Sequence, residues 1–352
     1  MPELEVRNRE LLGEGLPVVL DVEGGDHMPM FGVSAQDLVK GAQAAKENGV
    51  NVLVVGLEDT VAKSGLPFVI AQSVVKMGTS EKKGAIRDRG SSVNIAAMLV
   101  KETRASGFAS TCDTAAMIGA ATLGLGRYGS IYTPLVAEVP RSLKRGGSNI
   151  LLDVGAFPEK VSSQQLARYG LMGASYARFL GIERPRVALM ANGSEPAKGT
   201  EITREAHGIL AAVGGDFELI EGFVEGKDLF KDTADVIVVD GFAGNLVLKT
   251  AEGAAMAVLE SLPTQMRSDG RDEAFVNEAK NDIYALGAVF DPNGVGGAPI
   301  LGVKGNALVM HGSSTALAAT KALERLHRMA AANFQPALAA ELTRFKNVVS
   351  AE

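Results

Sequence analysis

Short apolar segments alternate along the chain with longer stretches in which apolar residues recur at helical spacing. The short segments are rich in Val, Ile and Leu and almost continuously apolar, as in VVLDV, NVLVVG, VALMA and DVIVVD. Strands buried on both faces of a parallel sheet have this composition, whereas half-exposed strands alternate apolar with polar residues. We therefore predict strands at Pro17–Val22, Asn51–Gly56, Gly107–Thr111, Asn149–Val154, Arg186–Ala191, Phe217–Gly222, Asp235–Asp240 and Ala307–His311.

The longer stretches predict helices, the first of which has a recognisable start. Ser34 and Asp37 form a capping-box pattern, in which each side chain bonds the backbone amide of the other, ahead of a helix over Ala35–Asn48. Further helices are predicted from Ser91 or Ser92 to about Ala105, from Ser163 (as cap) to about Leu180, and over Thr200–Ala212, Gly244–Leu262 and Ser314–Ala331.

Strands that alternate with helices predict an α/β protein. We expect a mostly parallel, doubly wound sheet between two helical layers, which is a three-layer α/β/α sandwich. Ligands of such folds bind beyond the carboxyl ends of the strands. No Gly/Ser linker or internal repeat marks a boundary, so residues 1–16 are expected to form an N-terminal extension and residues 17–352 a single domain. The polar stretch 263–283 is expected to be an exposed loop or a solvated helical excursion.

Composition excludes several classes of protein. The 352 residues carry a net charge of -6, whereas nucleic-acid binding requires a basic surface. The single cysteine, Cys112, cannot form an internal disulfide, which fits a reducing compartment. No apolar run approaches the ~20 residues needed to span a bilayer, and the charged N-terminal segment lacks the apolar core of a secretory signal. We expect a cytoplasmic protein that does not bind nucleic acid.

The segment after the first predicted strand, DVEGGDHMP, concentrates polar and small residues. Gly24 and Gly25 allow backbone amides to face an anion, with Asp26 and His27 presented to the same site. The segment lacks the GK[ST] of a nucleotide-binding loop, and no second His or Cys cluster has metal-ligand spacing, so we expect neither metal nor cofactor. The alternative is a glycine turn in which Asp26 and His27 satisfy backbone groups.

Further candidate groups follow other predicted strands. Lys198, in NGSEPAKG, carries the charge to neutralise a phosphate but is alternatively a solvent-facing loop lysine. Asn245, in DGFAGNLVLKT, suits a carbonyl or phosphate oxygen beside a helix N-terminus, or is simply a helix cap. His311, in VMHGSS, suits proton transfer or anion binding, with a structural role as the alternative. Cys112, in STCDTAAM, is a candidate nucleophile, although free cysteines more often pack as small apolar side chains.

Taken in order, these segments resemble the PlsX family, the phosphate acyltransferases of bacterial phospholipid synthesis. The matching pieces run from DVEGGDHMP through RGSSVNIAAMLVKE, LLDVGA, KGTE, DGFAGNLVLKTAEG and FDPNGVGGAPILGV to HGSS, and cover Pro17 to about Leu326. The resemblance implies a fold like that of isocitrate and isopropylmalate dehydrogenases, in a homodimer that uses no metal or nucleotide. It implies the conversion of acyl-acyl-carrier-protein and inorganic phosphate into acyl phosphate and free carrier protein.

The resemblance also assigns roles to the candidate residues. Lys198 and Asn245 would be the main polar groups at the reacting centre, together with His27 as a further catalytic group. Phosphate is itself the nucleophile, so catalysis would consist mainly of positioning it and stabilising the tetrahedral oxyanion. The adjoining substrate-binding groups would be Asp21, Gly25, Asp26, Asp240 and His311.

Several loops depart from the family pattern, which makes the chain a divergent member. Where the family reads SAGNTGA, residues 110–116 read STCDTAA, and Cys112 and Asp113 complete the substrate-binding set. An added carboxylate repels phosphate unless it is protonated or paired. Residues 156–162 and 191–195 also differ from the family. In the stretch 263–283 the family carries an apolar tip that touches membranes, but this chain is charged there, so membrane docking is not expected.

Four hypotheses follow for the function. The first is an acyltransferase that makes acyl phosphate from a thioester of acyl carrier protein or coenzyme A. The second is the same scaffold with another acceptor or with an acyl-Cys112 intermediate. The third is a non-catalytic protein that binds acyl carrier protein. The fourth, a metal- and NAD-dependent dehydrogenase, is disfavoured because the sequence has neither a clear aspartate metal cluster nor a substrate arginine motif.

Overall fold

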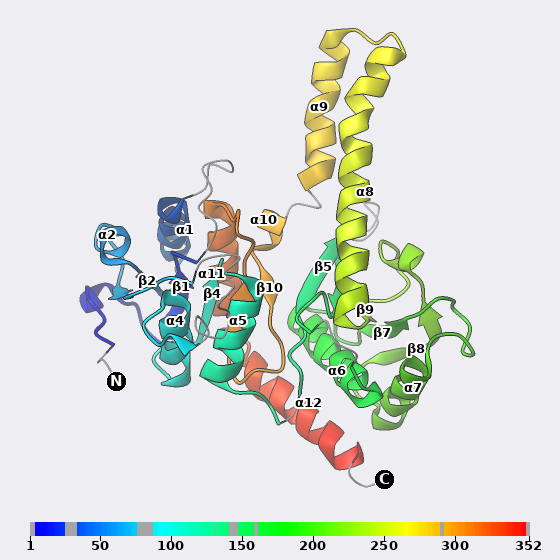
Figure 1. Ribbon diagram of the computed structural model, residues 1–352, viewed down its shortest axis with the longest axis horizontal. Helices are drawn as coiled ribbons and strands as arrows, with labels where there is room; N and C mark the ends of the chain where they lie inside the picture. Colours follow the sequence, from blue (N-terminus) through cyan, green and yellow to red (C-terminus); the bar gives the residue numbers. More distant parts are fainter. Residues whose placement is uncertain are drawn as a thin grey trace.

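The strands of the protein form two sheets (Figure 1). The structure is a computed structural model that describes residues 4–24, 34–75, 87–129, 131–140, 147–157, 161–288 and 292–349. The six-stranded sheet contains, in spatial order, β10 (Ala298–Pro299), β11 (Asn306–Val309), β4 (Gly107–Ser110), β1 (Val18–Asp21), β2 (Val52–Gly56) and β3 (Phe68–Ile70). The five-stranded sheet contains β5 (Val136–Pro140), β6 (Ser148–Leu152), β9 (Val236–Val238), β7 (Arg186–Met190) and β8 (Glu218–Val224).

Parallel pairing dominates both sheets. Among the pairs formed by the labelled strands of the described ranges, only the edge pairs β10–β11 and β5–β6 are antiparallel. Each predicted strand overlaps an observed one, and the ends differ by one or two residues; β6 and β11 begin one residue earlier than predicted, and β8 ends two residues later. The edge strands β5 and β10, and β3, were not predicted. Strand β5 reads VAEVP and β10 only AP, so neither has the apolar run that identifies a buried strand.

The predicted helices are also confirmed, with small shifts at their ends. Both hydrogen bonds of the capping box at Ser34 and Asp37 are present. The predicted cap Ser163 is wrong by one residue, because the hydroxyl of Ser162 accepts from the backbone amide of Gln165 at 3.3 Å. The longer helices are α1 (Ala35–Glu47), α4 (Ser92–Lys101), α6 (Ser163–Phe179), α7 (Glu201–Val213), α8 (Gly241–Ser268), α9 (Glu273–Ala288), α11 (Ala316–Ala331) and α12 (Phe334–Val349). Shorter helical segments are η1 (Arg9–Leu11), α2 (Glu58–Val61), α5 (Thr114–Ala120), η3 (Ala121–Leu125), η4 (Gly226–Asp228) and α10 (Pro292–Val295).

Helices cover both faces of each sheet, because successive strand residues point to opposite sides. In β1, Val18 and Leu20 pack in the cluster that includes α1 and α11, whereas Val19 packs in the cluster that includes α4 and α5. The second sheet packs one face against α6, α7 and α12, and its other face against the first turns of α8. The α/β fold class predicted from the sequence is therefore confirmed, with mostly parallel sheets between helices.

The start of the described chain lies against the edge of the first sheet. Arg7 and Phe68 exchange backbone hydrogen bonds of 2.9 and 3.2 Å, so this segment extends the sheet beside β3. Leu4 is buried in the core cluster that includes α4. Within residues 1–16, the stretch from Leu4 to Arg7 thus packs on the folded body.

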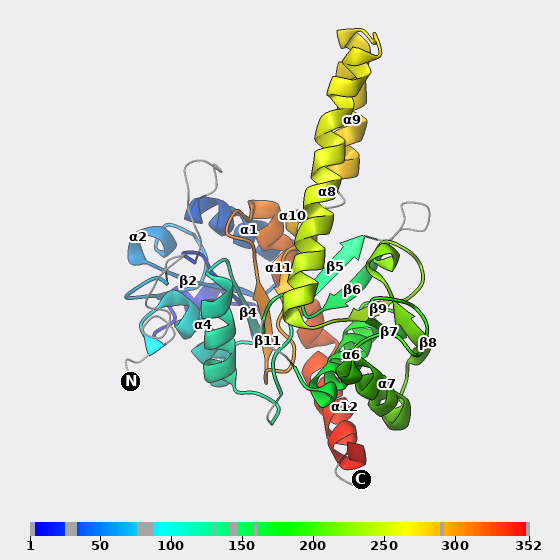
Figure 2. The ribbon, with the colours of Figure 1, turned by 45° about the vertical axis from the view of Figure 1, so that its right-hand side comes forward.

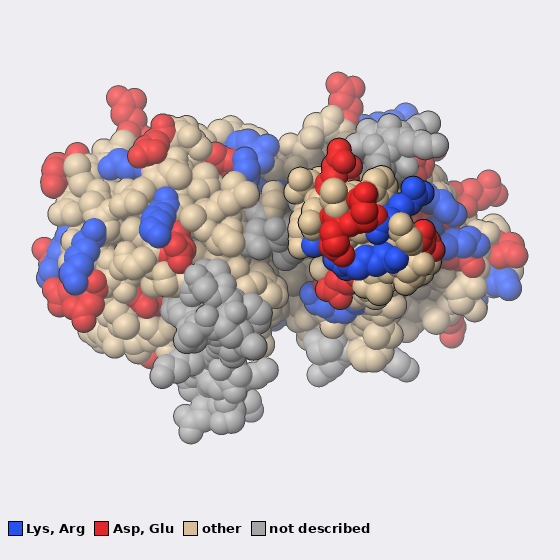
Figure 3. Space-filling view, turned by 90° about the horizontal axis from the view of Figure 1, so that it is seen from above, with Lys and Arg blue, Asp and Glu red and all other residues tan. Residues whose placement is uncertain are grey.

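Helices α8 and α9 form a long hairpin that projects from the body of the molecule (Figures 1 and 2). Of the two structures expected for residues 263–283, the helical excursion is the observed one. An Arg267–Glu273 ion pair of 2.6 Å joins the two helices at the tip, and Figure 3 shows acidic and basic side chains gathered over this end. Within the described ranges, no helix combines the length and the apolar content that a membrane crossing requires. Apolar side chains are nevertheless exposed along the hairpin at Met256, Val258, Phe275 and Tyr284.

Candidate active site

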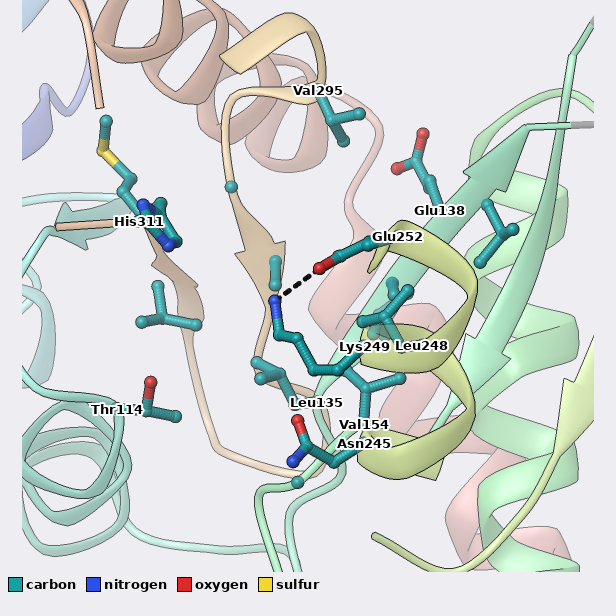
Figure 4. Close-up of a pocket in the computed structure, with 18 of the residues that line it drawn as sticks. Thr114, Leu135, Glu138, Val154, Asn245, Leu248, Lys249, Glu252, Val295 and His311 are labelled. Atoms are coloured by element: carbon teal, nitrogen blue, oxygen red, sulfur yellow. Dashed lines mark hydrogen bonds and ion pairs between the residues drawn. The ribbon is translucent and has the colours of Figure 1, made fainter. Parts of the chain in front are cut away.

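A cavity of about 580 Å³ lies between the two sheets (Figure 4). Strand β5 forms one wall, and the ends of β10 and β11 form the other, beside a backbone bridge that joins Leu135 to Ile300. Pockets of this size with apolar walls and a few polar groups are typical small-molecule sites. The apolar lining includes Leu135, Val136, Val139, Val154, Leu248, Ala251 and Val309.

Three polar residues of α8, Asn245, Lys249 and Glu252, line the cavity. Asn245 and Lys249 are four residues apart and therefore share one face of the helix, and both line the cavity (Figure 4). The ammonium of Lys249 lies 2.7 Å from a carboxylate oxygen of Glu252, which also lines the cavity. Sequence analysis proposed Asn245 but missed Lys249. The four-residue spacing from Asn245 was the signal that could have identified it.

His311 lines the cavity from the opposite side, just beyond the end of β11 (Figure 4). The backbone amide of Ser313 donates to Nδ1 of His311 at 3.2 Å, and the hydroxyl of Ser313 lies 2.7 Å from the same nitrogen. A ring nitrogen that accepts from an amide carries no proton, so the neutral imidazole keeps its proton on Nε2. The Nε2–H group is therefore the donor that His311 offers to a ligand.

Two of the predicted substrate-binding acids cap helices. The Asp240 carboxylate accepts from the Ala243 amide at 3.0 Å at the start of α8. The Asp113 carboxylate accepts from the amides of Ala115 and Ala116 at 2.9 and 3.2 Å at the start of α5. Neither acid lines the cavity. Each carboxylate already occupies the positive end of its own helix, where an anion would otherwise bind.

Asp21 connects the ends of β1 and β4. It is fully buried, and its carboxylate accepts from the hydroxyl of Ser110 at 2.8 Å and from the amide of Glu23 at 3.1 Å. Burial raises the pKa of Asp21, and these hydrogen bonds oppose the rise. The hydroxyl of Thr111 donates to the carbonyl of Gly24, which links the same two loops. The predicted site residues Gly25, Asp26 and His27 lie outside the described residues.

Asp153, which sequence analysis did not propose, organises the loop beneath Asn245. One of its carboxylate oxygens accepts from the amides of Leu135, Gly155 and Ala156 at 2.9, 3.1 and 2.9 Å, and the other accepts from Phe157 at 3.0 Å. Burial raises the pKa of the Asp153 carboxyl, although these amides oppose the rise. Gly155 has a φ of 114°, and a Cβ there would lie 3.3 Å from Cβ of Asn245. Asp153 therefore fixes the backbone against which Asn245 packs.

Lys198 stands on the loop between β7 and α7. In the sheet order β6-β9-β7, Gly155, Asn245 in the first turns of α8, and Lys198 follow the carboxyl ends of neighbouring strands. The stem of Lys198 packs over Gly193, where an added Cβ would lie 2.7 Å from Cγ of the lysine. Lys198 is exposed and does not line the cavity; its backbone amide donates to the carbonyl of Glu195 at 2.9 Å, but its ammonium has no hydrogen-bond or ion-pair partner among the residues that the structure describes.

Cys112 contributes to the cavity wall but is only 2% exposed. Burial raises the pKa of the Cys112 thiol far above its usual range, and the nearby Asp21 adds to the rise. Nucleophilic cysteines need an accessible thiolate, which a positive environment favours. The acyl-Cys112 hypothesis is therefore not supported, and Cys112 serves as a small apolar wall residue.

The second acid that lines the cavity, Glu138, forms an ion pair with Arg325 on α11, a helix that packs on the first sheet. Glu138 on β5 lies 2.5 Å from the guanidinium of Arg325 on α11, and their side chains are 11% and 7% exposed. The hydroxyl of Tyr176 donates to the same carboxylate oxygen at 2.7 Å. This buried cluster joins the two sheets beside the cavity. Within the described ranges, no three His, Cys, Asp or Glu side chains gather closely enough to hold a metal ion.

A family model described as "Fatty acid synthesis protein" matches residues 16–336. The chain belongs to this family. The resemblance to PlsX proteins, inferred from the ordered motifs, is thereby confirmed over nearly the whole folded chain.

Curated relatives are similar to this chain over nearly their full lengths. The phosphate acyltransferase of Myxococcus xanthus (strain DK1622) is 38% identical over 338 residues, which is 93% of this chain and 92% of the relative. The phosphate acyltransferase of Heliobacterium modesticaldum (strain ATCC 51547 / Ice1) is 36% identical over 333 residues, 91% of this chain and 96% of the relative. At this level of identity the relatives share the family.

Solved structures of other proteins share the fold. A phosphotransacetylase from Streptococcus pyogenes has a TM-score of 0.60 at 16% sequence identity, covering 92% of this chain and 96% of its own. A putative 4-hydroxythreonine-4-phosphate dehydrogenase from Salmonella typhimurium has a TM-score of 0.52 at 12% identity, covering 90% of this chain and all of its own. These likenesses bear on the fold alone, and they agree with the dehydrogenase-like fold expected from the sequence.

Proposed function

We propose that this protein transfers an acyl group from a thioester to inorganic phosphate. A phosphate oxygen attacks the thioester carbonyl carbon, the carbon–sulfur bond breaks, and the products are an acyl phosphate and a thiol. The observation that carries the proposal is the membership of the chain in a family whose curated relatives are named phosphate acyltransferases. The cavity supports it, because its apolar wall suits an acyl chain and its polar end suits an anion.

The proposed roles follow the positions of the polar groups. Asn245 donates its amide to the carbonyl oxygen as the tetrahedral oxyanion forms, and the Nε2–H of His311 donates from the opposite side. Lys198 swings from the neighbouring loop to offset the negative charge that develops there. His27 remains a proposed catalytic group. The surrounding positions Asp21, Gly25, Asp26 and Cys112 are proposed to shape the substrate site, and Asp113 and Asp240 to support it by capping α5 and α8.

We expect the thioester to be carried by acyl carrier protein or coenzyme A, in the cytoplasm, as a step in phospholipid synthesis. We also expect a homodimer. The apolar side chains exposed on the α8–α9 hairpin support the dimer, because a solvated helix pair seldom leaves Met256, Val258 and Tyr284 uncovered. Light scattering during size-exclusion chromatography tests it, and a mass of one chain at micromolar concentration would contradict it.

The activity itself is tested with purified protein, acyl-acyl-carrier-protein or acyl-coenzyme A of several chain lengths, and inorganic phosphate. We expect thiol release that depends on phosphate, together with an acyl phosphate that hydroxylamine converts into an acyl hydroxamate. Omission of phosphate is the control for simple thioester hydrolysis. Absence of phosphate-dependent thiol release at every chain length would refute the proposed function.

A further inference from the structure

Phosphate is a dianion near neutral pH and needs positive charge or backbone amides at its binding site. At the N-termini of α8 and α5, the carboxylates of Asp240 and Asp113 already place a negative charge and accept from the amides of Ala243, Ala115 and Ala116. Lys249 is the single lysine or arginine among the described residues that line the cavity. Among the lining residues that the structure describes, the positive charge therefore resides on Lys249.

The position of Lys249 suits an anion held beside the reacting thioester. Its side chain extends into the cavity from the same helix face as Asn245, and His311 faces it from the other wall (Figure 4). Three donors, the ammonium of Lys249, the amide of Asn245 and the Nε2–H of His311, thus belong to residues that line the same cavity. Apolar residues, such as Leu135 and Val139, also line it.

The ion pair between Lys249 and Glu252 is of a kind that a ligand can replace. The two side chains are 58% and 35% exposed, so water screens the pair and its net stabilisation is small. By contrast, the other acid of the cavity, Glu138, is buried with Arg325 and remains paired. A phosphate dianion offers Lys249 more negative charge than the single carboxylate of Glu252.

We propose that Lys249 binds the inorganic phosphate of the reaction by exchanging Glu252 for the anion, and that Glu252 competes with phosphate for the lysine. This inference rests on the proposed function, since it names the phosphate site of the same reaction. It predicts that Lys249 and Glu252, the two partners of one ion pair, have opposite effects on the affinity for phosphate. Loss of the lysine weakens phosphate binding, whereas loss of the carboxylate strengthens it.

The test is steady-state thiol release as a function of phosphate concentration at saturating thioester. Lys249→Met should raise the KM for phosphate about 10-fold, the size expected when one hydrogen bond to a charged group is lost. Glu252→Gln should lower that KM by up to about fivefold, because it removes a competing exposed ion pair. Lys249→Arg should stay within about threefold of the wild type, because it retains the charge.

A matched control exists on α11. Lys321 and Glu324 form another exposed pair three residues apart, at 3.3 Å, and neither residue lines the cavity. Lys321→Met should leave the KM for phosphate unchanged. Thermal unfolding of every variant shows whether it is folded. A KM within twofold of the wild type in folded Lys249→Met, or a higher KM in Glu252→Gln, would overturn the inference.

Direct titration of the full-length protein with inorganic phosphate separates this inference from the proposed function. Calorimetry should show phosphate binding to the wild type that is at least about 10-fold weaker in Lys249→Met. If the wild type binds phosphate through Lys249 but releases no thiol, the proposed function fails and the phosphate site stands. If thiol release is normal and Lys249→Met binds phosphate like the wild type, the site fails and the function stands.

Discussion

Two lysines at the same edge of the second sheet differ in the partners that hold them. Lys198 lies on the exposed loop after β7 and has no ionic partner among the residues that the structure describes, whereas Lys249 lies on α8, lines the cavity, and is paired with Glu252. An unpaired ammonium on a loop is free to turn toward charge that develops during the reaction. An ammonium in an exposed ion pair on a helix can exchange its carboxylate for another anion. We therefore expect Lys198 to act on the rate of the chemical step and Lys249 to act on the affinity for phosphate.

The largest effect is expected on the free energy of unfolding, when the buried ion pair between Arg325 and Glu138 is broken. Arg325→Met leaves the buried carboxylate of Glu138 without its partner, so we expect a loss of about 3–5 kcal/mol in the free energy of unfolding. Denaturation by urea measures it. Lys249→Met removes an exposed pair and should cost less than about 1 kcal/mol. Combining Arg325→Met with Glu138→Gln should recover part of the loss, and equal losses in Lys249→Met and Arg325→Met would contradict the contrast between exposed and buried pairs.

The next largest effect is expected on the rate. Lys198→Met should lower kcat by about 10²–10³-fold, the range seen when one donor to a developing oxyanion is removed. Its KM for phosphate should change little, because Lys249 and His311 remain. Thiol release at saturating phosphate measures kcat, and Lys227→Met, another exposed lysine outside the cavity, is the control. An unchanged kcat would identify Lys198 as a solvent-facing loop lysine.

The smallest effect is expected at Cys112, which lines the cavity but is buried. Because burial raises the pKa of its thiol, the thiolate fraction of Cys112 at pH 8 is far below that of an exposed cysteine. Iodoacetamide should therefore label Cys112 in urea but not in the folded protein, as followed by mass spectrometry. Cys112→Ser should retain activity within about threefold, since wall residues contribute packing rather than chemistry. Loss of all activity in a folded Cys112→Ser variant would contradict this expectation and would support an acyl-Cys112 intermediate.

Most strands and helices could be predicted from the sequence, but the division of the strands into two sheets could not. Continuous apolar runs identified the buried strands from Val18 to Val309, because burial on both faces leaves a local signature. Pairing between strands is not local, and the strand that walls the cavity, β5, contains Glu138 and Pro140 and has no such run. The cavity therefore was not visible in the sequence, although several residues that line it follow predicted strands.

The candidate site was predicted unevenly for a similar reason. Asn245 and His311 were found because each stands next to a glycine within a few residues of a predicted strand end, and both line the cavity. Lys249 was missed because it lies within a helix, where only its spacing from Asn245 points to the site. Asp113 and Asp240 were proposed to bind substrate, but hydrogen bonds to the amides of α5 and α8 already occupy their carboxylates. Whether an acid caps its own helix depends on side-chain rotation, which residue order does not determine.

One measurement tests the contrast between the two lysines most directly. The phosphate dependence of thiol release is recorded side by side for the wild type, Lys198→Met and Lys249→Met at saturating thioester. We expect Lys198→Met to lower kcat by about 10²–10³-fold with its KM for phosphate within about twofold, and Lys249→Met to raise that KM about 10-fold with kcat within about threefold. Similar changes in both variants, or a KM effect confined to Lys198→Met, would contradict the assignment of the phosphate to Lys249.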